Sequence, residues 1–212
     1  MGNFSKLAFT PSVKAVQERM GSRRAYARFE PGPLAPDSLG ETESEFLAEQ
    51  DHFYIASVGS TGWPYVQHRG GAKGFVQVLD EHTLAFADLR GNRQYISLGN
   101  IETDERVALI FVDYPTRTRL KILARAKVLG RNEATPLFER IATDPKVEHI
   151  VQLQVEAIDW NCQQHITPRF TEEQIAELVR PLRAEVERLE HENARLRSEV
   201  EGRPAPPRAG SH

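Results

Sequence analysis

The chain has 212 residues, 40% of them apolar and 27% charged, with a formal net charge of −3. This length can bury one substantial core, so we expect one main domain with an appendage rather than two equal domains. The small negative charge argues against a nucleic-acid partner, because sequence-independent binding needs an excess of cations.

Cysteine usage and hydropathy exclude further classes of protein. Cys162 is the only cysteine, which excludes an intrachain disulfide framework and a thiolate zinc site. A single thiol fits a reducing compartment, so we expect a cytoplasmic protein. We find no signal segment and no run of about 18 apolar residues, so neither secretion nor a membrane partner is expected.

The first 42 residues predict a helix followed by an extended connector. Apolar residues recur at helical spacing within residues 12–24, and the proline-rich stretch 30–36 cannot hold regular structure. Thr42 and Glu45 have the spacing of a capping box, which predicts a second helix over 43–50. The main domain is therefore expected to begin at residue 43.

From residue 53 the pattern changes to short strands joined by tight turns. The expected strands span residues 53–58, 63–69, 74–79, 83–88, 106–112, 118–129 and 151–158. Short helices are expected at 94–98 and 133–142. Many short strands without regular strand–helix alternation indicate a mainly β (α+β) domain over residues 43–170, an antiparallel barrel with small flanking helices.

The strand expected at 63–69 ends in an unusual polar segment, Gln67-His68-Arg69-Gly70-Gly71. Glycine has no Cβ, so its backbone can come close to a planar or phosphorylated ligand. A guanidinium offers paired donors to a phosphate. Taken alone, the segment also fits a surface charge beside a β-bulge.

Two more clusters place cations near strands. The segment 88–95 follows a strand and opens a helix, where free N–H groups and the helix dipole favour an anion, with Arg93 as the counter-charge. Arg117, Arg119 and Lys121 are expected on one strand face, because side chains alternate with period two. Such a face binds an anion or is simply solvated, and the pattern leaves both interpretations open.

The segment after the last expected strand combines aromatic, amide and imidazole side chains. Trp160, Asn161, Gln164 and His165 can together frame a ring system that needs stacking and edge hydrogen bonds. Taken alone, His165 is better explained as a structural histidine.

The order of these four clusters resembles that of the pyridoxamine 5′-phosphate oxidase-like family of FMN-binding split β-barrels. The resemblance rests on Arg69-Gly70-Gly71 after a Trp-Pro-Tyr strand, on the loop 91–94, and on the strands at 104–111 and 119–121, and it covers about residues 43–169. It implies an antiparallel split barrel and a homodimer with two FMN sites at the subunit interface.

By this resemblance, cations face the phosphate, other residues lie along the flavin, and the 160–165 segment reaches the ring from the partner subunit. The implied cofactor-binding residues are Gln67, His68, Arg69, Gly70, Lys73, Ala87, Asp88, Asn92, Arg93, Gln94, Arg119, Lys121, Trp160, Asn161, Gln164 and His165. Gln94 stands where the true oxidase has a second loop lysine. The chain also lacks the Trp-Arg-Leu-Asn-Pro-type segment of that enzyme's substrate site, so vitamin B6 oxidation is not expected.

Residues 171–201 predict a coiled-coil helix, and residues 202–212 a disordered tail. Thr171 and Gln174 form a second capping box. The seven-residue repeat consists of Ile175, Leu182, Leu189 and Leu196 at one core position and Val179, Val186, Asn193 and Val200 at the other. This pattern favours a parallel two-stranded coil. Pro181 is expected to break or kink the helix, and a solvated single helix is the alternative.

These features together predict an FMN-dependent oxidoreductase. The flavin would carry hydride or electrons between a donor such as NAD(P)H and an unidentified small molecule. No catalytic residue and no metal ligand is assigned. The alternative is a non-catalytic dimeric module that binds flavin, haem or a deazaflavin and joins a partner protein through its coiled coil.

Overall fold

A computed structural model describes residues 2–133, 135–142, 144–161 and 163–202. The chain divides into two compact units, Met1–Thr167 and Pro168–His212. The disordered tail was expected at residues 202–212, and residues 203–212 of it lie outside the described residues. In the part that the structure describes, no helix combines the length and the apolar composition needed to cross a bilayer.

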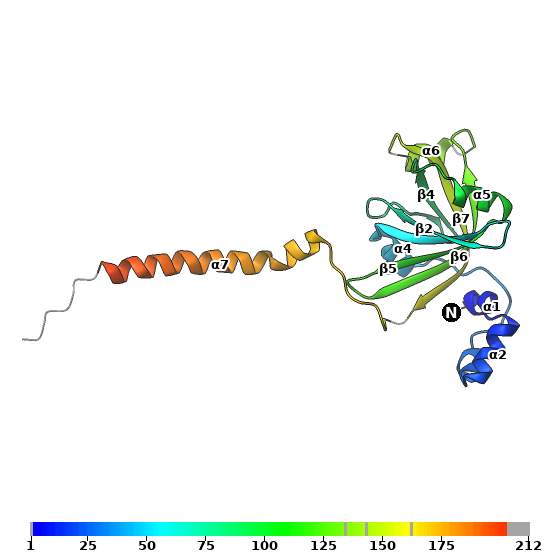
Figure 1. Cartoon of the computed structure of the whole chain (residues 1–212), viewed down its shortest axis with the longest axis horizontal. Coiled ribbons are helices and arrows are strands. Elements are labelled where there is room, and N and C mark those ends of the chain that lie inside the picture. Colours follow the sequence, from blue (N-terminus) through cyan, green and yellow to red (C-terminus); the bar gives the residue numbers. More distant parts are fainter. Residues whose placement is uncertain (1, 134, 143, 162, 203–212) are drawn as a thin grey trace, which may run out of the picture. The chain divides into compact units, whose positions relative to one another are not determined.

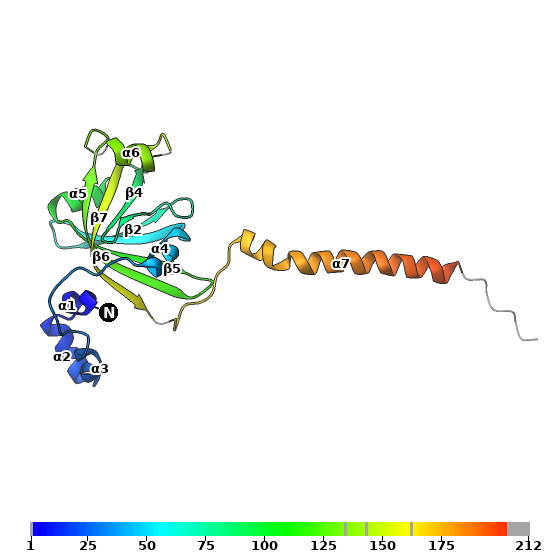
Figure 2. The ribbon, with the colours of Figure 1, turned by 180° about the vertical axis from the view of Figure 1, so that it is seen from behind.

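The first unit is built on one curved antiparallel sheet of seven strands (Figure 1). Its strands are β1 (His52–Val58), β2 (Pro64–Gly70), β3 (Gln77–Asp80), β4 (Thr83–Leu89), β5 (Arg106–Asp113), β6 (Thr118–Leu129) and β7 (Val147–Asn161). They lie in the order β2-β1-β5-β6-β7-β4-β3. The sheet curls around its core without closing, seen from behind in Figure 2, and this confirms the predicted antiparallel split barrel.

Alternating burial along the strands explains why they form this sheet. Residues of β1 and β5 alternate between buried and half-buried positions, the pattern of a strand with one face on a core. Phe53 of β1, Phe86 of β4 and Phe111 of β5 are at most 1% exposed. The ring centroids of Phe86 and Phe111 lie 5.2 and 4.9 Å from that of Phe53. This aromatic cluster therefore fixes the centre of the barrel.

Strand β4 is buried on both faces. Leu84 and Phe86 face the main core, whereas Ala85 belongs to a second cluster that includes Phe138 and Ile150. Phe138 comes from the helix α6 (Thr135–Ile141), so this helix covers the outer face of β4 and β7.

The helices of the first unit differ from the predictions in number and in bounds. They are α1 (Gly2–Ala8), α2 (Pro11–Arg19), α3 (Arg23–Ala27), α4 (Glu41–Ala48), α5 (Ile96–Thr103) and α6. The capping box predicted at Thr42 is wrong: Gly40 is the N-cap of α4, and Oε2 of Glu43 accepts a hydrogen bond from its N–H at 2.9 Å. The single helix expected over 12–24 is two helices, separated at Gly21, where φ is +75°.

The strand predicted over 74–79 begins three residues later than expected. Gly74 has a φ of +72°, and its N–H bonds to the carbonyl of Gln50 at 3.0 Å. A side chain there would lie 3.1 Å from the Ala48 carbonyl oxygen. Gly74 therefore belongs to a tight turn that positions α4 beside β3.

The N-terminal helix α1 was not predicted, because its buried residues, Asn3 and Ser5, are polar. It lies beside the end of β7 (Figures 1 and 2). Asp37 of the connector joins the two, since its carboxylate accepts from the N–H of Asn3 and from the N–H of Ile158, both at 2.9 Å. The side-chain amide of Asn3 also donates to the Glu156 carbonyl at 2.8 Å.

Replacing Asp37 with alanine is expected to lower the free energy of unfolding by about 1.5 to 3 kcal/mol, the usual effect of losing hydrogen bonds to a charged group. It should also expose residues 2–36 to limited proteolysis, because both backbone donors lose their common acceptor. Urea unfolding and a protease time course measure the two effects. Asp37→Asn, which keeps one acceptor oxygen, is the control, and an Ala variant as resistant as the parent would contradict the role of Asp37.

The second unit contains the helix α7 (Glu172–Glu201). As predicted, Thr171 is its N-cap: Oγ1 of Thr171 accepts from the Gln174 N–H at 3.2 Å, and Oε1 of Gln174 accepts from the Thr171 N–H at 2.9 Å. Pro181 lies inside a continuous helix, so the predicted break is absent, and Figure 1 shows a bend in the first turns.

Candidate functional site

The end of β2 brings Arg69 against Asp88 of β4. Nη1 of Arg69 donates to Oδ1 of Asp88 at 2.5 Å, and the two side chains are 15% and 6% exposed. His149 of β7 is the cross-strand neighbour of Asp88, with 3.9 Å between its Nδ1 and Oδ2 of Asp88. Three strands that are distant in the sequence therefore place a cation, an acid and an imidazole together.

Burial affects the ionisation of Asp88. Burial raises the pKa of Asp88, and the Arg69 guanidinium opposes that rise. Nε of Arg69 and Nδ1 of His149 are buried, and neither has a hydrogen-bond partner among the described residues. The ion pair therefore leaves two polar nitrogens unsatisfied while its own charges compensate each other.

A cavity of about 160 Å³ lies beside Arg69. It is lined by His68, Arg69, Gly70, Phe75, Phe86, Ala87 and Leu89. The guanidinium carbon of Arg69 lies 6.0 Å from the centroid of the Phe86 ring. The cavity therefore combines two aromatic side chains with an imidazole and a guanidinium.

The loop 90–95 follows β4 and is anchored on Glu148. Nε of Arg90 donates to Glu148 at 2.8 Å, and the hydroxyl of Tyr95 donates to it at 3.2 Å. The hydrogen bond from Arg90 lowers the pKa of Glu148. Nε of Arg93 donates to the Tyr95 hydroxyl, at 3.3 Å. Arg90 and Arg93 are both exposed, and Arg90 is the one that forms an ion pair with Glu148.

The backbone of the same loop is strained. Arg93 and Tyr95 have φ values of +62° and +53°, a left-handed conformation that is uncommon outside glycine and that concentrates at functional sites. The helix α5 begins directly after Tyr95, whose side chain makes no capping hydrogen bond to the first turn of the helix. An exposed cation beside an uncapped helix N-terminus is favourable for an anion.

Gln67 and Asn92, two other predicted residues, accept hydrogen bonds in or beside the loop 90–95. Oε1 of Gln67 accepts from the hydroxyl of Ser97 at 2.7 Å, which ties β2 to the first turn of α5. Oδ1 of Asn92 accepts from the N–H of Gln94 at 3.2 Å. Gln94 itself is exposed.

The glycines after Arg69 serve internal packing. A Cβ at Gly71 would lie 2.7 Å from Cγ of Phe75, and one at Gly70 would lie 3.1 Å from Cε1 of His68. The imidazole of His68 stacks on that of His52, with 5.8 Å between centroids. Lys73 forms an exposed ion pair with Glu49 at 3.0 Å.

The remaining predicted residues lie at the other end of β7. Arg119 of β6 is in register with Asn161. Nζ of Lys121 lies 3.8 Å from Oδ2 of Asp159 and 5.9 Å from the ring centroid of Phe4, a residue of α1. Lys121 is therefore engaged by its own chain.

Trp160 is also engaged by its own chain. Its Nε1 donates to Oε1 of Glu43 at 2.7 Å, and its ring packs edge-on against Phe46 of α4 at 4.9 Å. Gln164 and His165 are exposed in the turn that follows β7.

One prediction for β6 is wrong. Arg117, expected on the strand with Arg119 and Lys121, precedes β6 and has a φ of +59°. Left-handed backbone belongs to the turn, so Arg117 does not share the strand face with the other two cations.

The structure thus separates the predicted residues into two groups. Asp88 pairs with His149 near the start of β7, and Leu120, between Arg119 and Lys121, pairs with Trp160 near its end. The strand between His149 and Trp160 is roughly 35 Å long at about 3.3 Å per residue. The two groups therefore lie toward opposite ends of β7.

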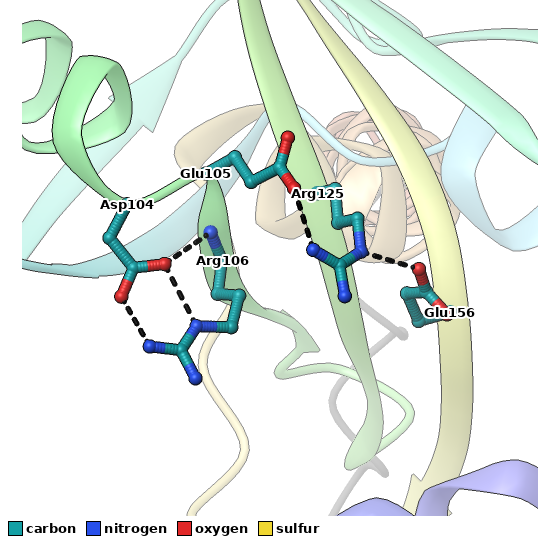
Figure 3. Close-up of polar contacts among 5 residues, drawn as sticks. All are labelled: Asp104, Glu105, Arg106, Arg125 and Glu156. Carbon is teal, nitrogen blue, oxygen red and sulfur yellow. Dashed lines mark hydrogen bonds and ion pairs between the residues drawn. The ribbon is translucent and has the colours of Figure 1, made fainter.

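A second hollow, of about 820 Å³, lies between α5 and β6. Three of its charged side chains, Asp104, Glu105 and Arg125, form ion pairs with each other or with neighbouring residues (Figure 3). Arg125 donates to Glu105 at 2.6 Å and to Glu156 at 2.9 Å. Arg106 binds Asp104 through two nitrogens and holds the pKa of that carboxyl down at about 2. Arg125 is thus already satisfied by two carboxylates and is not a free guanidinium for an anion.

Sequence reasoning missed His149, Glu148 and Tyr95. His149 and Glu148 lie on the part of β7 that precedes the predicted strand 151–158, and they meet Asp88 and the 90–95 loop through the pairing of β4 with β7. Extending that strand to the valine at 147 would have placed both residues on a strand, but not beside β4.

Comparisons with known proteins give one significant family match. The family model for pyridoxamine 5′-phosphate oxidase matches residues 39–163. A search of curated proteins found no significant match.

Solved structures with a similar fold include three from bacteria. HupZ of Group A Streptococcus is 15% identical, with a TM-score of 0.46, and the alignment covers 62% of this chain and 100% of HupZ. The haem storage protein HutZ of Vibrio cholerae is 18% identical, with a TM-score of 0.40 and coverages of 56% and 92%. General stress protein 26 of Bacillus anthracis is 13% identical, with a TM-score of 0.40 and coverages of 60% and 92%. These values are too low to carry an argument about function.

The family match spans more than half of the chain, and it includes the whole seven-stranded sheet together with the Arg69–Asp88 pair and the 90–95 loop. On this basis the chain belongs to the pyridoxamine 5′-phosphate oxidase family.

Proposed function

We propose that this protein binds FMN and uses it as an oxidoreductase acting on a small molecule. The flavin, when bound, supplies the hydride or electron chemistry, and the protein supplies binding, orientation and a site sheltered from water. The observation that carries the proposal is the 90–95 loop, where an exposed arginine stands beside an uncapped helix N-terminus within a domain of this family.

The described residues fit such a ligand. A phosphate needs N–H donors and positive charge, and the start of α5 and Arg93 supply both. Nε of Arg69 is a buried donor without a partner beside the 160 Å³ cavity. Phe75 and Phe86 line the same cavity and offer apolar contact.

The roles of the predicted cations differ in this proposal. Arg69 is compensated by Asp88, Arg90 by Glu148, and Lys73 by Glu49. Among the described residues no carboxylate forms an ion pair with Arg93, and Glu148, which attracts it, is already paired with Arg90, so Arg93 carries the net charge for the phosphate. Arg69 acts chiefly as a hydrogen-bond donor.

The two groups of predicted residues support a homodimeric site. Arg119 and Trp160 lie toward the opposite end of β7 from the Asp88 group. The family resemblance implies that this second group reaches the flavin from a second copy.

The absorption spectrum of the purified protein tests the proposal. We expect the two visible bands of an oxidised flavin, bleached by NADH or NADPH under anaerobic conditions. A colourless protein that does not bind FMN in a titration would overturn the proposal, and so would a Soret band. A bound flavin that neither nicotinamide reduces, and that shows no turnover with oxygen, would contradict the oxidoreductase part and leave a binding module.

Replacing Arg93 with alanine is expected to weaken FMN binding by about tenfold or more, because a charge-assisted contact to the phosphate is lost. Fluorescence titration with FMN measures the dissociation constant. Riboflavin, which lacks the phosphate, should bind the variant and the parent equally. Arg19→Ala removes the same charge from an exposed position on α2 and serves as the control. Equal FMN affinity for the Arg93 variant and the parent would remove Arg93 from the site.

A further inference from the structure

The helix α7 carries a row of apolar side chains that nothing in the described part of the chain covers. No residue of this 30-residue helix is buried. Leu182, Leu189 and Leu196 are 67%, 49% and 46% exposed, and Val186 and Val200 are 53% and 69% exposed. A row of large apolar residues along one helix face indicates a surface that is buried against another helix.

The spacing of this row identifies the packing. Leucine or isoleucine recurs every seven residues at one position, d, from Ile175 to Leu196, and valine recurs at the other, a, from Val179 to Val200. A repeat of 3.5 residues keeps the row in contact with a partner helix of the same kind. β-Branched residues at a with leucine at d favour two parallel strands. Asn193 takes one a position, where it can hydrogen-bond only to an asparagine in the same register.

We propose that α7 pairs with α7 of a second copy of this chain as a parallel, in-register, two-stranded coiled coil over residues 179–200. This inference is independent of the proposed flavin chemistry. It names a second copy as the occupant of the row because the two seams, and the lone asparagine in them, are self-complementary.

The charges beside the seam select the parallel orientation. The flanking position g holds Glu185, Glu192 and Glu199. In an antiparallel pair, g positions face g positions, so glutamates would oppose glutamates along the whole seam. In a parallel pair, g faces the e position five residues later in the other helix. Glu192 then attracts Arg197 of the second copy.

One parallel contact, between Glu185 and Glu190 of the second copy, joins like charges. The structure shows how this repulsion is reduced. Arg188 donates to Glu185 at 2.8 Å and to Glu192 at 2.9 Å on its own helix, and Arg195 donates to Glu199 at 2.8 Å. Each of these arginines occupies position c, outside the seam. These bonds lower the repulsion at each glutamate without cancelling it. The parallel pair retains one such contact between like charges, whereas the antiparallel pair has one wherever g positions meet.

Pro181 does not interrupt the proposed seam. It also occupies position c, and the helix continues through it. The hydrogen bond that Pro181 cannot donate is therefore missing on the outer side of the helix, away from the seam. The repeat from Leu182 onward is intact.

Disulfide trapping in the full-length protein tests the proposal. The parent for the test is Cys162→Ser, which removes the only native thiol. Val200→Cys places a thiol at an a position near the end of the seam, and Ser198→Cys places one at the outward position f of the same turn. A disulfide needs Cα atoms no more than about 7 Å apart, which a parallel in-register pair provides at residue 200 and not at residue 198.

Under mild oxidation, Val200→Cys is expected to form the covalent dimer at least about tenfold faster than Ser198→Cys, because pairing raises the local thiol concentration. Similar rates for both variants, as random collision would give, would overturn the proposal. If the natural partner were a helix of another protein, Val200→Cys would likewise show no preferential trapping, and the proposal would be overturned. A mixture of size-tagged Val179→Cys and Leu196→Cys chains that links mainly between these two positions would show an antiparallel pair, in which a positions face d positions, and would equally overturn it.

Discussion

Replacing Arg69 with methionine is expected to lower the free energy of unfolding by about 3 to 5 kcal/mol near neutral pH, the usual result of removing one partner from a buried ion pair. The side chains of Arg69 and Asp88 are 15% and 6% exposed, so water cannot replace the lost guanidinium. Methionine preserves most of the side-chain volume and isolates the effect of the charge. Urea unfolding monitored by tryptophan fluorescence measures the difference.

The same variant should make stability depend on pH. Burial already raises the pKa of Asp88, and Arg69 opposes that rise, so the pKa in the folded variant rises further. Between the unfolded value, about 3.9, and this raised value, the folded state binds more protons than the unfolded state. Stability therefore falls as pH increases through that window.

The deficit of the Arg69 variant should accordingly shrink when the pH is lowered into the window and be largest above it. The double variant with Asp88→Asn should recover most of the loss at pH 7, because no buried charge remains unpaired. A deficit that is constant across pH, or that the double variant does not reduce, would contradict the role given to the ion pair.

Replacing Phe53 with alanine is expected to cost about 3 to 5 kcal/mol of unfolding free energy, the range for deleting a buried aromatic ring. Phe53 is fully buried, and its ring contacts those of Phe75, Phe86 and Phe111. Its loss opens a cavity among strands β1, β4 and β5, which cannot move together without breaking their ladders. Chemical unfolding gives the free energy.

The matched control for this variant is Val66→Ala on the neighbouring strand β2. Val66 is 60% exposed, so its truncation should cost less than about 1 kcal/mol. If Phe53→Ala were as mild as this control, the aromatic cluster would not be the centre of the core.

The barrel was predictable because its strands obey a local rule. Alternating apolar residues indicated β1, β5 and β6, and the predicted bounds of β6 agree with the structure at both ends. The rule fails for the start of β7, which the predicted strand 151–158 does not include. Residues 144–149 contain a proline and four charged or imidazole side chains, so they show no apolar alternation. It also fails for α1, which packs polar residues against the sheet.

The candidate site was predictable in composition but not in arrangement. The polar segments around Arg69 and Arg93 are visible in the sequence as interruptions of apolar strands. The ion pair of Arg69 with Asp88, and the hydrogen bonds of Glu148 to Arg90 and Tyr95, depend on how β4 pairs with β7 and where β2 ends in space. Strand order is a non-local property, so no spacing within one segment reveals it.

The hydrogen bonds that Asp37 and Asn3 make with the end of β7 also determine when the first helix can dock. Asn3 and Asp37 are synthesised well before their hydrogen-bond partners, the Glu156 carbonyl and the Ile158 N–H, which are among the last residues of the sheet to leave the ribosome. At about 5 to 20 residues per second, the end of β7 is synthesised roughly ten seconds after the connector. During that interval α1 has no docking surface, and a nascent chain halted before β7 should keep its N-terminal segment open to chaperones and proteases.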